Sequence, residues 1–112
     1  MLDKPPFGLS EEQLDRIRNT IASSPRVVRA FIFGSRAMGT YRNGSDIDIA
    51  LEGEDLTFDD ILRLHSSIDA LNLPYFVDIV DVKRIENPDL RDHIKRIGML
   101  IYQRLSVFTT DI

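Results

Sequence analysis

Two aspartates at positions 46 and 48 have the residue type and spacing that metal chemistry needs. They stand two positions apart in the alternating stretch SDIDIALE, residues 45–52. Side chains two positions apart in a strand project from one face, about 7 Å apart along the backbone. Two like charges that close repel each other unless a cation lies between them, and Mg²⁺ takes carboxylate oxygens together with substrate phosphates. Asp46 and Asp48 therefore predict a metal site, with a solvated face of an amphipathic strand as the alternative.

A third carboxylate interrupts an apolar stretch further along the chain. Asp78 lies in YFVDIVDV, residues 75–82, with apolar neighbours on both sides. A carboxylate in such surroundings normally requires a partner or a metal. Asp78 is therefore a candidate third ligand, and a surface acid on an edge strand is the alternative.

A glycine-serine pair follows directly after the apolar stretch VVRAFIF, residues 27–33. Gly34, which has no Cβ, suits a sharp turn or the close approach of a ligand to the backbone. If a helix begins at Ser35, its free N–H groups and its hydroxyl can bind phosphate, and Arg36 can add a charged donor. A plain strand-to-helix turn, with Ser35 as its cap, is the alternative.

The elements that must position these residues alternate along the chain without a linker or a repeat. Strands are predicted at residues 27–33, 45–52 and 75–82. Helices and strands in this order favour an α/β or α+β fold, a small mixed sheet flanked by helices, within one domain of residues 1–112.

Capping patterns mark where the predicted helices begin. Ser10 with Gln13, and Thr57 with Asp60, have the spacing of capping boxes. Asn87-Pro88 predicts the start of the last helix. Apolar residues at helical spacing predict that this helix runs on to residue 105, namely Leu90, Ile94, Ile97, Ile101 and Leu105. His93 is expected on its solvated face, and His65 in a packing or surface role.

Composition excludes several other classes of function. The chain has no cysteine, which excludes disulfides and thiolate metal sites. It has only two histidines, well separated in the sequence, which argues against a zinc site. No apolar run reaches the length of a membrane span, and residues 1–10 lack a signal-peptide layout, so the protein is expected to be cytoplasmic. A net charge of -4 without a basic, aromatic-rich stretch argues against nucleic acid as the main partner.

The combined motif resembles that of a known superfamily. Gly34-Ser35 and Asp46-x-Asp48, separated by ten residues, resemble the nucleotidyltransferase signature of the DNA polymerase beta superfamily. Asp78 is similar to that superfamily's third carboxylate, and the resemblance covers about residues 27–105. The short length resembles the minimal nucleotidyltransferases, the MNT antitoxins paired with HEPN ribonuclease toxins. Met38 stands where many relatives carry a second basic residue.

This resemblance implies an activity and a set of roles. It implies Mg²⁺-dependent transfer of AMP from ATP to a tyrosine of a cognate HEPN toxin. Asp46 and Asp48 would hold two Mg²⁺ ions, Asp78 would ligate the metal on the acceptor side and take the hydroxyl proton, and residues 34–36 would hold the β and γ phosphates. Two alternatives are an antitoxin that acts by binding alone and a small-molecule nucleotidyltransferase of the aminoglycoside-modifying type.

Overall fold

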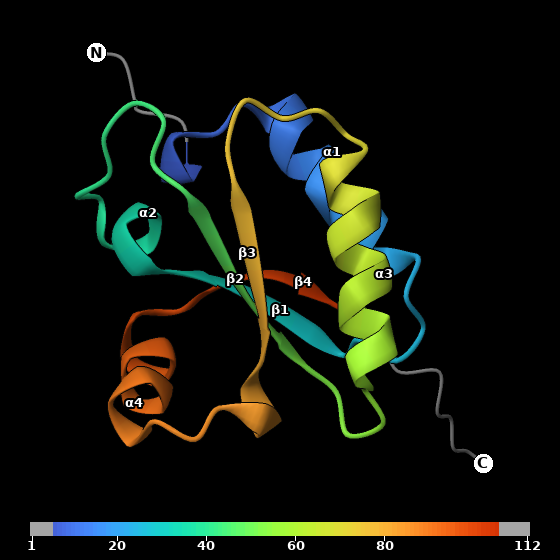
Figure 1. Cartoon of the computed structure of the whole chain (residues 1–112). Coiled ribbons are helices and arrows are strands. Elements are labelled where there is room, and N and C mark those ends of the chain that lie inside the picture. Colours follow the sequence, from blue (N-terminus) through green and yellow to red (C-terminus); the bar gives the residue numbers. More distant parts are fainter. Residues whose placement is uncertain (1–5, 106–112) are drawn as a thin grey trace.

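A four-stranded mixed sheet forms the centre of the protein (Figure 1). The computed structural model describes residues 6–105. Residues 1–5, which belong to the segment expected to lack a signal peptide, and residues 106–112 lie outside the described residues. The strands, in the spatial order β3-β2-β1-β4, are β1 (Arg29–Phe33), β2 (Ile47–Glu52), β3 (Val77–Asp81) and β4 (Met99–Gln103). Strand β1 runs antiparallel to β2 and β4, while β3 is parallel to β2. The predicted fold class is confirmed.

Helices lie on both faces of this sheet (Figure 1). Their bounds are α1 (Glu11–Ala22), α2 (Gly34–Met38), α3 (Phe58–Asp69) and α4 (Pro88–Ile97), with short 3-10 turns at Pro6–Gly8 and Val82–Arg84. Helices α1 and α3 lie together on one face, and α2 and α4 lie on the other. Both predicted capping boxes and the Asn87 cap are present. No helix within residues 6–105 combines the length and apolarity needed to cross a membrane.

The alternation of side chains in β2 divides the protein into two apolar clusters. Ile47, Ile49 and Leu51 are fully buried in the main core, together with buried residues of α1 and α3. The intervening residues face the other way, where Ala50 belongs to a smaller cluster with Phe33 and Ile94. The main core therefore holds the sheet from one face and leaves Asp48 on the face of α2 and α4.

The prediction of one long last helix is wrong. Helix α4 ends at Ile97, the N–H of Gly98 donates to the carbonyl of Ile94, and β4 follows. Ile101 is buried as a strand residue of the main core, and Arg18 donates to its carbonyl. The apolar spacing after Gly98 fits a helix locally, but pairing with the free edge of β1 satisfies the backbone groups of this segment.

The three predicted strands begin at Arg29, Ile47 and Val77, each two residues later than expected.

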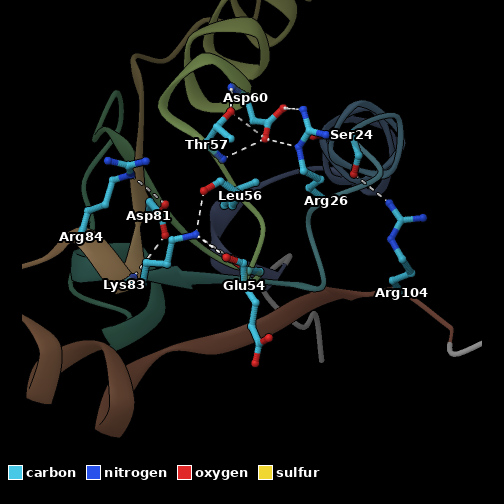
Figure 2. Close-up of polar contacts among 11 residues, drawn as sticks. Ser24, Arg26, Glu54, Leu56, Thr57, Asp60, Asp81, Lys83, Arg84 and Arg104 are labelled. Carbon is cyan, nitrogen blue, oxygen red and sulfur yellow. Dashed lines mark hydrogen bonds and ion pairs between the residues drawn. The ribbon is translucent and has the colours of Figure 1, made fainter.

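A polar network holds the end of the sheet where β2 leads into α3, away from the predicted site (Figure 2). The carboxylate of Asp60 accepts two hydrogen bonds from Arg26 and one from the N–H of Thr57, which ties the start of α3 to the segment before β1. The ammonium of Lys83 donates to three backbone carbonyls of the β2-α3 connection, those of Gly53, Glu54 and Leu56. These contacts fix the connections that lie away from the predicted site.

The Arg26–Asp60 pair gives stability a pH dependence. The hydrogen bond from Arg26 is the largest cause that holds the pKa of Asp60 well below its ordinary value of 3.8. The folded state favours the charged carboxylate of Asp60. The stabilisation that this carboxylate gives the folded state is therefore fully present above pH 3.8 and is lost as the pH falls below that value. We expect the unfolding free energy of the wild type to fall more between about pH 7 and about pH 3 than that of Asp60→Asn.

Urea denaturation at both pH values measures this difference. Asp15→Asn is the matched control, because Asp15 forms an exposed ion pair with Arg18 and such pairs contribute little. Parallel pH profiles for the wild type and Asp60→Asn would contradict the prediction.

Candidate active site

The structure brings the three predicted carboxylates together at one end of β2 and β3. Asp48 and Asp78 are direct partners in the parallel register of these strands, and Asp46 immediately precedes β2. Burial raises the pKa of Asp48, and the charges of Asp78 and Asp46 raise it further. Asp46 and Asp78 are therefore both close enough to Asp48 to act on it electrostatically.

The carboxylates differ in exposure. Asp48 is half-buried, whereas Asp46 and Asp78 are exposed. Strand β3 is an edge strand, so the alternative interpretation of Asp78 as an edge-strand acid fits its exposure. Its register opposite Asp48 nevertheless gives the two side chains a shared face. The site is consequently open to solvent on the side of Asp46 and Asp78.

Gly34 is packed directly against the carboxylate of Asp48. Its φ of +73° lies in the left-handed region that favours glycine, and a Cβ at this position would collide with Oδ2 of Asp48. The contact follows from the sheet, because Phe33 is the Cα partner of Asp48 in the β1–β2 register. The end of β1 thus delivers the Gly34-Ser35 turn to the acidic pair, and glycine is required there for two separate reasons.

Arg36 occupies a different place from the one expected of a phosphate donor. Its side chain is 3% exposed, and its guanidinium donates to backbone carbonyls of the loop before β2 and of the N-terminal 3-10 turn. Those bonds reach the carbonyls of Ser45 (2.6 and 3.1 Å), Asp46 (3.2 Å) and Phe7 (2.8 Å), while the rings of Tyr41 and Tyr75 lie 5.3 and 4.4 Å from the guanidinium carbon. Arg36 therefore anchors the loop that carries Asp46.

His93 is a site residue that the sequence analysis missed. It lies on α4, where its Nε2 accepts a hydrogen bond from the N–H of Gly34 at 3.2 Å. The residue was expected on a solvated face. The contact could not be found from the sequence, because the partner of His93 is 59 residues away and no local pattern marks such a contact.

The donor set fits a hard divalent cation. Within residues 6–105 no three His, Asp or Glu side chains are gathered tightly enough to form a ready-made metal centre. The carboxylates of Asp46, Asp48 and Asp78 nevertheless supply only oxygen ligands, and their mutual repulsion is what a bound cation would relieve.

Comparison with known proteins places the chain in a family. A family model described as polymerase beta, nucleotidyltransferase, matches residues 15–106. The chain belongs to this nucleotidyltransferase family. Among curated proteins a sequence search finds no significant match.

Solved structures share the fold of this nucleotidyltransferase. A chain of a toxin–antitoxin crystal structure with AMP-PNP is 26% identical, with a TM-score of 0.67 over 81% of this chain and 73% of that one. A protein assigned as a minimal nucleotidyltransferase is 29% identical, with a TM-score of 0.63 over 80% and 92%. A complex of a tri-AMPylated Shewanella oneidensis HEPN toxin with an MNT antitoxin shares the fold at 21% identity, with a TM-score of 0.65 over 86% and 74%. The match to a minimal nucleotidyltransferase agrees with the resemblance seen in the sequence.

Gly34 and Gly39 form a matched pair that isolates the contact with Asp48. Both have positive φ, but a Cβ at Gly39 meets nothing within 4 Å. Gly39→Ala should cost only the backbone strain of about 1 kcal/mol. Gly34→Ala should cost about 0.5–1.5 kcal/mol more, because its methyl group forces the carboxylate of Asp48 out of its preferred rotamer.

Chemical denaturation of the two variants measures this difference. The double variant Gly34→Ala/Asp48→Ala should lose most of the extra destabilisation that Gly34→Ala shows relative to Gly39→Ala, because the colliding carboxylate is removed. Equal costs at the two glycines would contradict the packing of Asp48 on Gly34.

The raised pKa of Asp48 makes a second prediction. The folded state holds the Asp48 proton more tightly than the unfolded state does, so stability falls as the pH rises above the ordinary value of 3.8. Asp48→Asn removes this penalty. In EDTA, the variant should therefore be more stable than the wild type near neutral pH, with the difference shrinking below about pH 4. Urea denaturation at neutral pH and below about pH 4 measures the unfolding free energies of the two proteins. An Asp48→Asn protein that is less stable than the wild type at neutral pH would show a structural role for the charge.

Proposed function

We propose that this nucleotidyltransferase is an antitoxin that transfers AMP from ATP to a tyrosine hydroxyl of a cognate HEPN-type toxin, in a Mg²⁺-dependent reaction. The observation that carries the proposal is the packing of Asp48 on Gly34 beside Asp78, within a chain of the nucleotidyltransferase family. The 26% identical relative from a toxin–antitoxin pair with AMP-PNP supports both the nucleotide and the kind of partner.

The proposed reaction assigns a task to each carboxylate. The acceptor oxygen attacks the α-phosphorus, the bond from that phosphorus to the bridging oxygen breaks, and pyrophosphate leaves. Asp46 and Asp48 would hold the metal, and Asp78 would also ligate it and would accept the hydroxyl proton. When bound, two Mg²⁺ ions would supply neutralisation of the charge that develops during the transfer.

Residues 34–36 divide between two tasks in this proposal. Gly34 allows the backbone to approach the nucleotide, and Ser35, which is half-buried at the start of α2, offers its N–H and hydroxyl to phosphate. Arg36 acts indirectly, because its guanidinium is committed to the carbonyls of Ser45 and Asp46. It therefore holds the loop in the position from which Asp46 can ligate metal.

The exposure of the site supports a protein acceptor. Asp46 and Asp78 are both exposed, so the described residues do not enclose a small acceptor between them. A partner that holds its tyrosine at this surface converts a bimolecular step into an effectively unimolecular one. The net charge of -4 suits a more basic partner that binds RNA, because complementary charge speeds encounter.

The proposal is tested with the purified cognate toxin, ATP and Mg²⁺. We expect the toxin to gain the mass of AMP on a tyrosine and to lose ribonuclease activity, and we expect EDTA or Asp46→Asn to abolish the mass gain. Asp69→Asn is the matched control, because it removes an exposed acid from α3 on the other face of the sheet. This variant should transfer AMP at the wild-type rate.

Two outcomes favour the alternatives. A toxin that is silenced without a change in mass, including by Asp46→Asn, would mean that binding alone neutralises it. Label that appears on an aminoglycoside and never on the toxin would mean a small-molecule transferase.

A further inference from the structure

The short helix α2 begins without a cap of its own. Its N-cap residue, Phe33, has no side-chain group that can accept a hydrogen bond, and the first N–H groups of a helix have no partner within the helix. The N–H of Gly34 finds its acceptor in Nε2 of His93 at 3.2 Å. Helix α4 thus supplies the cap that α2 lacks.

The ring of His93 is held in the orientation that this bond requires. It is half-buried, and it meets the ring of Phe33 edge-on, with centroids 6.1 Å apart and an angle of 77° between the planes. Because Nε2 accepts the hydrogen bond, the proton of the neutral ring resides on Nδ1. Packing and hydrogen bonding therefore fix His93 against the two residues that connect β1 to α2.

Gly34 contacts both His93 and Asp48. Its N–H donates to Nε2 of His93, and its Cα is packed against the carboxylate of Asp48. A displacement of Gly34 would remove the surface that sets the direction of Oδ2. The chain of contacts thus runs from α4 through His93 and Gly34 to Asp48.

We propose that His93 is a positioning residue of this nucleotidyltransferase, which fixes Gly34 by its Nε2 and thereby fixes Asp48. The inference rests on the proposed function for its effect on catalysis. The hydrogen bond itself does not depend on that function. Reacting groups displaced by about 1 Å can lose about 100-fold in rate, so the effect should appear in kcat and not in the KM for the toxin.

Two substitutions separate the hydrogen bond from the packing. His93→Gln keeps an acceptor near the position of Nε2, whereas His93→Phe keeps a ring against Phe33 but has no acceptor. Arg96→Ala is the matched control on the same helix, because it breaks only the exposed pair with Asp92.

The first readout is hydrogen exchange of the Gly34 amide, followed by NMR, which needs no activity. Exchange should be slow in the wild type, His93→Gln and Arg96→Ala, and at least about tenfold faster in His93→Phe, as expected for an amide that has lost its partner. Equal exchange in the wild type and His93→Phe would overturn the inference.

The second readout is the rate of AMP transfer to the toxin. In His93→Phe, kcat should fall about 10- to 100-fold with KM unchanged, and His93→Gln should recover most of the rate. An unchanged kcat in His93→Phe, in a folded protein, would overturn the positioning role. A wild-type protein that transfers no AMP but shows the expected exchange pattern would contradict the proposed function and leave the bond between His93 and Gly34 standing.

Discussion

The contact between the carboxylate of Asp48 and the backbone of Gly34 is the constraint on which the rest of the site depends. It exists because β1 and β2 are antiparallel with Phe33 opposite Asp48, so the turn that follows β1 starts beside the acid. The same alternation sends Ile47 and Ile49 into the main core under α1 and α3. Burial of these residues therefore sets the register, and the register sets the site.

Long-range contacts hold this arrangement against the repulsion of its own charges. Arg36 ties the loop before Asp46 to the N-terminal segment, and His93 ties α4 to Gly34. Burial and the charges of Asp78 and Asp46 raise the pKa of Asp48. Like charges this close disfavour one another's ionised form unless a cation lies between them. The network of Asp60 and Lys83 at the other end of the sheet holds the connection between β2 and α3.

The sequence predicted the features that local chemistry determines. The capping boxes at Ser10 and Thr57 lie within four residues, and the alternation in β2 follows from the strand period. The last helix was extended wrongly because its spacing continues past Gly98, while the pairing of β4 with β1 is non-local. The contacts of Arg36 and His93 were missed for the same reason, since their partners come from distant segments that only the fold brings near.

Paramagnetic broadening by Mn²⁺ in the presence of AMP-PNP tests the central claim most directly. Mn²⁺ accepts the same oxygen ligands as Mg²⁺ and broadens the NMR signals of nearby nuclei. We expect the amide signals of Gly34, Asp48 and Asp78 to broaden first, and Asp48→Asn to weaken the effect. The signals of Asp60, whose carboxylate is occupied by Arg26, should stay sharp at the same concentration. Broadening centred on Asp60, or none at Asp48 and Asp78, would contradict a metal-nucleotide site at the contact between Asp48 and Gly34.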